Sequence, residues 1–221
     1  MSDRDLVRRV RKLGDALKRA SEWRGSSIEV DGAKDDFVYE LLCYASAALA
    51  ATAHFKVTLV LRPHPKSKKL VSLFPRKPGC KKNFSLLLLK GSSNQIEFQL
   101  CPGIYVEDRH GKRRAPDINL LGANAAEDPT HLHLLAMWDA KHVRDETQRL
   151  ADTAVSDFVI TFEELGSPAP PGNWTSVIGT QAFFASGLIT NGCPSTERPA
   201  MLKQRKVSET SGFPKKPLTR P

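Results

Sequence analysis

The 221-residue chain lacks several features that would assign it to a particular class of protein. Its four cysteines form no CxxC pair and no zinc-knuckle spacing, so we expect reduced thiols rather than a disulfide framework. No apolar run approaches the length of about 20 residues that a membrane span needs. The N-terminus lacks the order of charged, apolar and small residues that makes a signal peptide. These absences predict a cytoplasmic protein that makes no contact with a membrane.

The composition is that of a folded protein. Hydrophobic residues make up 40% of the chain and charged residues 26%, which excludes a wholly disordered chain and a collagen-like repeat. The length suits one globular domain with extensions. We therefore expect a basic amphipathic helix within residues 1–30, a folded domain over 31–192, and a flexible basic tail over 193–221.

The formal net charge of +9 is unevenly distributed. Residues 62–90 contain nine basic and no acidic residues, and both ends of the chain are also basic, so the centre carries an excess of acid. Basic extensions around an acidic centre suit a polyanion that also meets carboxylate-bound cations, and nucleic acid is the simplest such ligand. Solubility alone is the competing explanation for such a charge run. The residues expected to contact nucleic acid are Lys66, Lys68, Lys69, Arg76, Lys77, Lys81 and Lys82.

Hydrophobic periodicity predicts an α/β domain. Helical spacing covers residues 3–24 and 35–54, and short apolar runs separated by turn residues follow it. The expected strands are 57–61, 85–89, 96–100, 117–121 and 132–138, with one or two more within 174–179 and 182–189. Residues 145–165 read as a helix, although 159–162 could instead form a strand.

Two short motifs are the most informative part of the sequence. Pro116-Asp117 begins one expected strand, and Asp139-Ala140-Lys141 ends the next. Because residues i and i+2 of a strand point to the same side, Asp139 and Lys141 should emerge together while Ala140 offers its carbonyl. Two carboxylates beside one ammonium would suit Mg²⁺ or Mn²⁺, which takes carboxylate and phosphate oxygens.

These motifs resemble the signature of the PD-(D/E)xK nucleases, the restriction-endonuclease-like superfamily. Their fold is a mixed central sheet flanked by helices with an α-β-β-β-α-β core, and the expected order of elements is similar. Nucleases of modification-dependent restriction systems often carry a Tyr-Glu-Leu on the first helix and an Asp-Ala-Lys-Tyr on the key strand. This chain has Tyr39-Glu40-Leu41, and His142 stands in place of the last tyrosine.

The resemblance implies a role for each motif residue. Asp117, Asp139, Glu40 and the carbonyl of Ala140 would hold the metal ion. Lys141 would orient the attacking water or help to deprotonate it, and would offset the charge that grows on the phosphate. Structural explanations stand beside these roles, since Asp117 could form a turn, Asp139 and Lys141 an exposed ion pair, and Glu40 a solvated helix position.

Several other residues compete for a functional role. Glu97 lies on the polar face of its strand and is the alternative to Glu40 as the upstream carboxylate, and Gln148 could touch DNA or water at the site. The pattern His131-x-His133, together with His142, could indicate zinc, but no cysteine or carboxylate partner follows at a suitable spacing. The tryptophans are too scattered for a base-stacking platform and are expected in the core.

The sequence thus predicts a metal-dependent endonuclease that hydrolyses the phosphodiester bonds of DNA, with a role in restriction or anti-phage defence. The alternatives are a non-catalytic nucleic-acid-binding protein and an interaction subunit that docks through its N-terminal helix. Nucleases of this fold often act as dimers, so the resemblance adds a second copy of the chain or a defence-system subunit as a partner.

Overall fold

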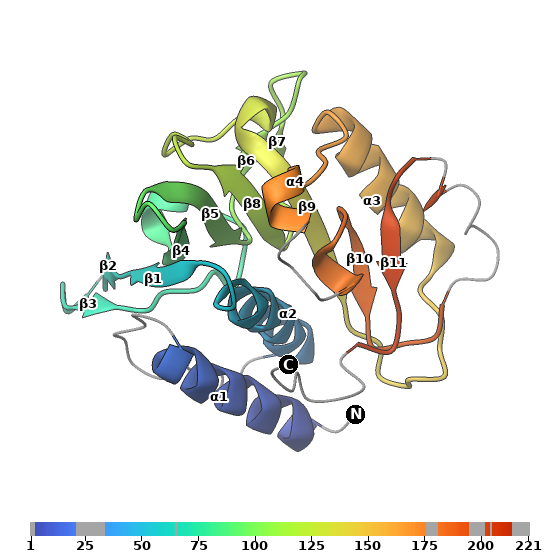
Figure 1. Cartoon of the computed structure of the whole chain (residues 1–221). Helices are drawn as coiled ribbons and strands as arrows, with labels where there is room; N and C mark the ends of the chain where they lie inside the picture. Colours follow the sequence, from blue (N-terminus) through green and yellow to red (C-terminus); the bar gives the residue numbers. More distant parts are fainter. Residues whose placement is uncertain are drawn as a thin grey trace.

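The structure is a computed structural model that describes residues 3–20, 34–64, 66–175, 181–194, 202–203 and 205–213. These residues form a mixed α/β fold around a seven-stranded mixed sheet (Figure 1). The helices are α1 (Asp3–Ala20), α2 (Asp35–Ala51), α3 (Asp152–Glu164) and the single turn α4 (Gly172–Thr175). The strands of the central sheet are β1 (Lys56–Val60), β4 (Leu86–Lys90), β5 (Ile96–Pro102), β8 (Ile118–Gly122), β9 (Leu134–Lys141), β10 (Gly187–Thr190) and β11 (Ser208–Thr210).

The strands of the central sheet follow the order β1-β4-β5-β8-β9-β10-β11. Neighbours from β1 to β9 are antiparallel, whereas β10 runs parallel to both β9 and β11. A helical crossover is needed between parallel neighbours, and α3 supplies it between β9 and β10. Two small hairpins lie outside this sheet, β2 (Arg62–Pro63) with β3 (Leu70–Val71), and β6 (Val106–Glu107) with β7 (Arg113–Arg114).

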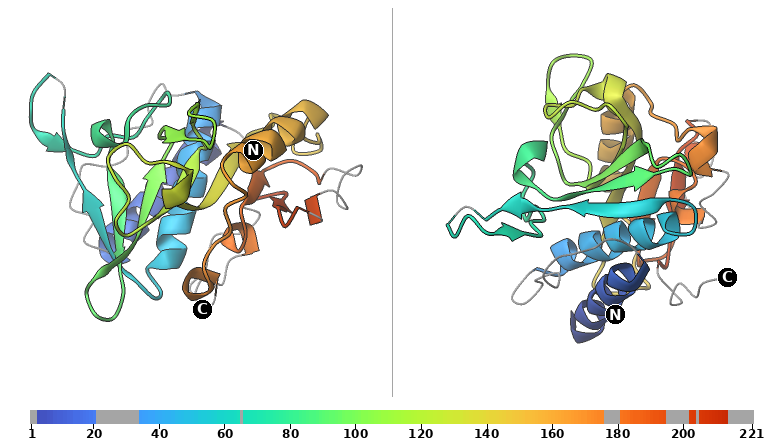
Figure 2. Two further views of the ribbon diagram at one scale, coloured as in Figure 1. Left: turned by 90° about the horizontal axis from the view of Figure 1, so that it is seen from above. Right: turned by 60° about the vertical axis from the view of Figure 1, so that its left-hand side comes forward.

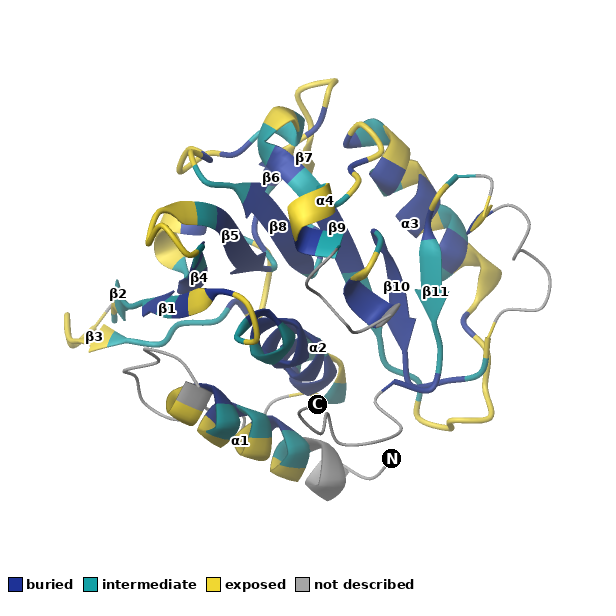
Figure 3. Cartoon of the chain, viewed as in Figure 1, coloured by how far each residue is buried: buried dark blue, intermediate teal, exposed yellow. Residues whose placement is uncertain are grey.

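Helices cover both faces of the sheet. Helix α2 packs on one face with α1 outside it, and α3 packs on the other (Figure 1). Because both faces are buried, β4 reads as an almost continuous apolar run instead of an alternating one (Figure 3). Trp138 and Trp174 are fully buried in the core beneath α2, with ring centroids 6.2 Å apart, which confirms the expected core role of these two residues. Trp23 lies outside the described residues.

Helix α1 uses its apolar face within the fold. Val10 and Leu17 are fully buried and belong to the same core cluster as α2, while Lys12, Lys18 and Arg19 are exposed on the opposite face (Figure 3). The amphipathic pattern of the sequence therefore corresponds to packing against α2.

Several expected elements differ in the structure. Helix α3 begins at Asp152 and not at residue 145, because Asp145 first forms a side-chain turn that accepts hydrogen bonds from the backbone N–H and the hydroxyl of Thr147. Residues 159–162 lie within α3 and are helical, not extended.

Two expected strands and part of the expected tail also need correction. Trp174 lies in α4 and not in a strand, because the residues after Pro171 close a helical turn through the bond from the Trp174 N–H to the Pro171 carbonyl. Residues 176–180 lie outside the described part of the chain. Residues 208–210, expected in a flexible tail, form β11 and pair with β10.

None of the helices in the described part of the chain combines the length and apolar character that a bilayer crossing requires.

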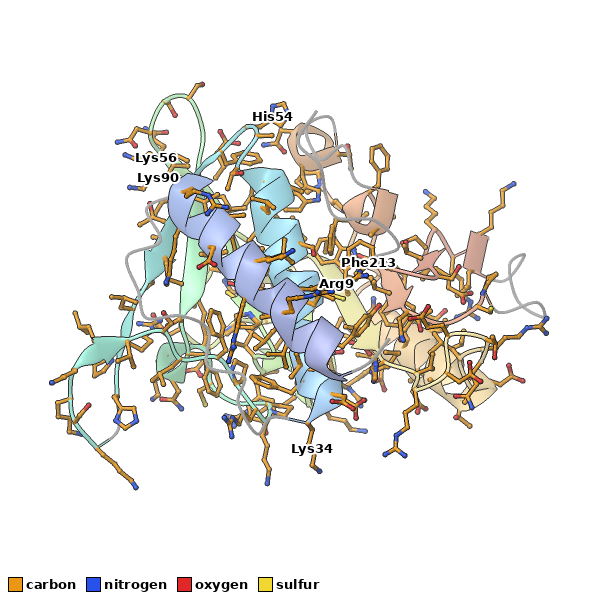
Figure 4. The ribbon with its side chains drawn as sticks, turned by 90° about the horizontal axis from the view of Figure 1, so that it is seen from below. Arg9, Lys34, His54, Lys56, Lys90 and Phe213 are labelled. Carbon is orange, nitrogen blue, oxygen red and sulfur yellow. The ribbon has the colours of Figure 1, made fainter. Side chains whose placement is uncertain are left out.

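The register of the sheet decides which loops lie near the expected site residues. Because β1 to β9 alternate in direction, the ends of β1, β5 and β9 meet the beginnings of β4 and β8 at one end of the sheet. We call this the Lys141 end. Helix α2 connects to β1 at the opposite end, where Lys56 pairs with Lys90, so the N-terminal half of α2 lies toward the Lys141 end. Figure 4 shows Lys34 and His54 at the two ends of this helix.

We expect the Leu17→Ala variant to lower the free energy of unfolding by about 2–5 kcal/mol, because it opens a cavity between α1 and α2. Urea denaturation followed by circular dichroism measures this loss. The exposed Lys18→Ala is the matched control and should change the stability by less than about 0.5 kcal/mol. Equal, small effects of both substitutions would show that α1 does not pack on the domain.

Candidate active site

The site is built where the ladder between β8 and β9 ends. The last backbone pair is Ile118 with Trp138, and beyond it side chains replace strand pairing. The N–H of Asp117 donates to Oδ1 of Asp139 at 3.3 Å, and the N–H of Ala140 donates to Oδ2 of Asp117 at 2.8 Å. The two carboxylates thus lie between the diverging strands, each fixed by a backbone donor of the other strand.

Lys141 closes this arrangement. Its Nζ lies 3.2 Å from Oδ2 of Asp139 and 3.8 Å from Oδ2 of Asp117. The exposed fractions of the side chains are 18% for Asp139, 19% for Asp117 and 35% for Lys141, so the lysine has the most exposed side chain of the three. The structure therefore brings together Asp117, Asp139 and Lys141 from two strands. Their catalytic role stays a prediction.

Helix α2 adds a third carboxylate from Glu40. Burial raises the pKa of Glu40 from 4.5 to about 7. The positive charge of Lys141 opposes this rise, whereas the negative charges of Asp139 and Asp36 add to it. Glu40 lies in the N-terminal half of α2, at the Lys141 end of the sheet. The helix thus places this carboxylate within the electrostatic reach of the strand residues.

The three carboxylates of the site carry more negative charge than the ammonium of Lys141 neutralises. Burial and the nearby charge of Asp139 raise the pKa of Asp117 well above its usual value, even though Lys141 and the Ala140 N–H lower it. Burial lowers the pKa of Lys141, but the carboxylates of Asp139 and Asp117 outweigh burial and raise it. Three carboxylates around one ammonium leave an excess of two negative charges when all are ionised.

Two asparagines that sequence reasoning missed hold this end of the sheet. Nδ2 of the fully buried Asn119 donates to the carbonyl of Pro116 at 2.9 Å, which fixes the turn before Asp117. Asn191 accepts the N–H of Val143 at 2.8 Å and donates to its carbonyl at 2.7 Å, so its side-chain amide acts as a piece of strand beside the residues after Lys141. The signal in the sequence that could have identified both residues is an asparagine inside or just after an apolar strand.

Tyr39 connects the helix that carries Glu40 to the strands. Its hydroxyl donates to the carbonyl of Phe213, just after β11, at 3.0 Å, and its ring lies 5.6 Å from that of His142. The side chain of His142 is 5% exposed, and its Nδ1 lies 3.8 Å from Oδ1 of Asp36. Tyr39, which precedes Glu40 in α2, therefore packs against His142, which follows Lys141.

The structure separates Glu97 from the site. Residue 98 of β5 pairs with residue 122 at the end of β8, whereas Asp117 precedes the beginning of β8. With a rise of about 3.4 Å per residue, Glu97 lies about 20 Å along the strand from the level of Asp117. Its carboxylate accepts a hydrogen bond from Nδ2 of Asn173 instead. The structure therefore does not bring Glu97 to the carboxylates of Asp117 and Asp139, whereas Glu40 lies within their electrostatic reach.

The other candidates also lie apart from the carboxylates. Gln148 is exposed in the turn before α3. His131 and His133 do not share a strand face, because residues 131–133 form a 3-10 turn in which Nδ1 of His133 lies 3.1 Å from the Thr130 backbone nitrogen, which donates to it. Within the described residues, no three His, Cys, Asp or Glu side chains are grouped as in a metal centre, and this applies to Glu40, Asp117 and Asp139 as well as to the three histidines. The zinc alternative gains no support, and metal binding by the three carboxylates stays a prediction. The four cysteines are free thiols.

Most residues of the basic segment are exposed as expected, but Lys81 is not. Its exposed fraction is 3%, and its Nζ donates to the carbonyls of Ala125 and Ala126 at 2.7 and 2.9 Å. Burial also lowers the pKa of Lys81. The expectation that Lys81 binds phosphate is therefore wrong, because its ammonium holds the loop between β8 and β9. Exposed side chains are found at Lys66, Lys68, Lys69, Arg76, Lys77 and Lys82.

The donor chemistry of the site fits a hard divalent cation. Carboxylate oxygens and a strand carbonyl are the ligands that Mg²⁺ and Mn²⁺ prefer, and the excess of two negative charges that arises when all three carboxylates are ionised would match the charge of such an ion. The raised pKa values of Asp117 and Glu40 show that the lysine alone does not compensate the buried carboxylates.

Comparisons with protein-family models, with curated proteins and with solved structures found no match to this chain. The geometry of the site and the charge of the surface around it are therefore the basis for a function.

Glu40 should make the stability of the metal-free protein depend on pH. A carboxyl group whose pKa is higher in the folded than in the unfolded chain stabilises the fold below the unfolded value, and this contribution is lost as the pH rises through the folded value. In EDTA, the free energy of unfolding should therefore fall between pH 4.5 and about 7. The slope for one such group is at most about 1.4 kcal/mol per pH unit.

Urea denaturation across this range, repeated with Glu40→Gln, isolates the contribution. The variant should lose part of the slope, and Glu97→Gln, a matched change at the other end of the sheet, should keep it. Parallel curves for the wild type and Glu40→Gln would contradict the raised pKa.

Proposed function

We propose that the chain is a metal-dependent endonuclease that hydrolyses phosphodiester bonds of DNA. The observation that carries the proposal is the convergence of Asp117, Asp139 and Lys141 where β8 and β9 diverge, with the carboxylate of Glu40 supplied by α2. Two carboxylates held by backbone N–H donors, with an ammonium paired to both, form a preorganised charged group, which is what phosphoryl transfer requires from a protein.

The order of elements supports a restriction-endonuclease-like arrangement. Helix α2, the antiparallel strands β5, β8 and β9, helix α3 and the parallel strand β10 follow one another as an α-β-β-β-α-β series. In this interpretation β1 and β4 extend the sheet at one edge and β11 at the other. The resemblance to nucleases of modification-dependent restriction systems extends the proposal to a role in defence against foreign DNA.

The carboxylates and the lysine of the site would have different roles in the reaction. Asp117, Asp139, Glu40 and the carbonyl of Ala140 would hold Mg²⁺ or Mn²⁺, which supplies positive charge that acidifies water and offsets charge on the phosphate. Lys141 would orient the attacking water or help to deprotonate it, and would offset the charge that grows on the scissile phosphate. Without a metal ion, the carboxylates of Asp139 and Asp117 raise the pKa of Lys141.

A non-catalytic nucleic-acid-binding protein is the second candidate. The observation that favours it is the ion pair itself, because a lysine on two aspartates can also serve to hold β8 against β9. An interaction subunit that docks through α1 is less favoured, because Val10 and Leu17 on the apolar face of α1 are already buried in the fold.

Cleavage of supercoiled plasmid DNA in the presence of Mg²⁺ or Mn²⁺ tests the proposal. The wild-type chain should convert the plasmid to nicked or linear forms, and EDTA should stop the reaction. Asp139→Asn and Lys141→Gln should each slow cleavage by about 100-fold or more, because each removes charge that acts in the transition state. Binding of the same DNA in EDTA should persist in both variants.

Glu40→Gln and Glu97→Gln form a matched pair in the same assay. The first should slow cleavage and the second should leave it unchanged. If the wild-type chain binds DNA but does not cleave it with either cation, the second candidate function holds instead.

A further inference from the structure

We infer that the hairpin of β2 and β3, residues 62–71, binds the phosphate backbone of duplex DNA on one flank of the site, so that the duplex runs from Lys141 toward β1 and not across α3. We call this hairpin the basic arm. The inference rests on the proposed nuclease function for the identity of the site as the place where DNA is cleaved. The evidence that the hairpin is a binding surface does not depend on that function.

The basic arm leaves the body of the molecule at the end of the sheet that carries the site. It follows β1 directly, and β1 ends at the Lys141 end. The arm has its own two-stranded ladder and projects beyond the central sheet (Figure 2). At its tip, Nδ1 of His64 accepts hydrogen bonds from the N–H groups of Lys66 and Ser67, which fixes the turn that carries the lysines.

The arm and the loop after it carry exposed positive charge that the described chain leaves without ion pairs, apart from Arg62 at the base of the arm, which lies 3.8 Å from Glu127. Residues 62–90 contain no acidic residue. Six side chains are exposed, and within the described ranges none of the six forms an ion pair; they are Lys66, Lys68, Lys69, Arg76, Lys77 and Lys82. Like charges held close together are unfavourable unless an anion approaches them, and a phosphate backbone presents anions at regular spacing.

The other flank of the site has the opposite charge. Residues 144–165, the loop after β9 and helix α3, contain two arginines and six acidic residues. Exposed carboxylates occur in both the loop and the helix, at Asp145, Glu146, Asp152, Asp157 and Glu163. A polyanion that enters the site is therefore attracted toward the basic arm and repelled from α3, which gives its path a direction.

The spacing between neighbouring strands gives the distance from the basic arm to the site. Strands β4, β5 and β8 lie between β1 and β9, so the arm begins about 17–19 Å from the site at about 4.8 Å per strand. This span corresponds to about five to six base pairs at about 3.4 Å each. The basic arm would therefore hold the backbone roughly half a helical turn from the scissile bond.

The arm is suited to phosphates rather than to unpaired bases. Residues 62–71 contain no phenylalanine, tyrosine or tryptophan on which bases could stack. The nearest aromatic residue along the chain, Phe74, packs edge-on against Tyr44 at 5.6 Å. A surface that offers only cations should prefer the duplex, which has twice as many phosphates per unit length as one strand in the same helix.

Equilibrium binding of the full chain to a fluorescent 20-base-pair duplex in EDTA tests the inference. The arm variant is Lys66→Gln, Lys68→Gln and Lys69→Gln, and the charge-matched control is Lys12→Gln, Lys18→Gln and Arg19→Gln on the exposed face of α1. The arm variant should bind at least tenfold more weakly at about 0.1 M salt. Its slope of log K against log salt should shrink by about 2–3, as expected for three lost phosphate contacts.

The control variant should bind within about twofold of the wild type, and a single strand of the same length should bind more weakly than the duplex. Equal losses in the arm and control variants, or tighter binding of the single strand, would overturn the inference. If binding depends on the arm but the chain does not cleave DNA, the binding surface is supported and the proposed nuclease function is overturned. If the arm variant cleaves DNA as well as the control variant does, the nuclease function stands and the binding role of the arm is overturned.

Discussion

The carboxylate of Asp117 completes the sheet at the point where β8 leaves β9. It accepts the N–H of Ala140, a donor on the edge of β9 that no backbone carbonyl of β8 reaches, and Asp139 returns the interaction by accepting the N–H of Asp117. A polar group inside a fold must find a partner, and here two carboxylates serve as the partners of two strand amides. Their positions are therefore fixed by the backbone and not by rotamer choice.

Bringing these carboxylates together is electrostatically unfavourable for the folded state. Carboxylates at the end of a sheet, partly removed from water, repel one another. Among the residues that the structure describes, only Lys141 lies close enough to form ion pairs with two of them. A protein under selection for stability alone would be better served by neutral side chains in these positions. The surroundings instead hold the charges in place, through Asn119 bonded to Pro116, Asn191 bonded to Val143, and Tyr39 of the Glu40 helix bonded to Phe213. Such local conflict with stability is common at functional sites.

The sequence predicted the elements that carry the site, because their signals are local. The helix of Glu40, the strand after Pro116 and the strand that ends at Lys141 each follow from hydrophobic spacing. The structure then showed what spacing cannot. From the sequence, Glu40 is the expected upstream carboxylate and Glu97 its alternative, and the pairing of β5 with β8 places Glu97 at the opposite end of the sheet from Asp117.

Lys81 and the C-terminal strand illustrate the second limit. A lysine within a basic run looks exposed, but a fold can bury an ammonium when two carbonyls of a distant loop receive it, and that loop is more than forty residues away in the chain. Likewise β11 is too short and too polar to be recognised, and it forms because β10 leaves a free edge. Both features depend on tertiary contacts between segments with weak local signals.

A crystal of the protein soaked in Mn²⁺ tests the account most directly, because the anomalous signal of manganese locates the ion without reference to activity. The account predicts one strong peak within coordination distance, about 2.2 Å, of the carboxylates of Asp117 and Asp139 and of the carbonyl of Ala140, and its loss in the Asp139→Asn variant. The account would be contradicted by a crystal that has β8, β9 and the ion pairs of Lys141 with both aspartates as described, but no manganese at this end of the sheet.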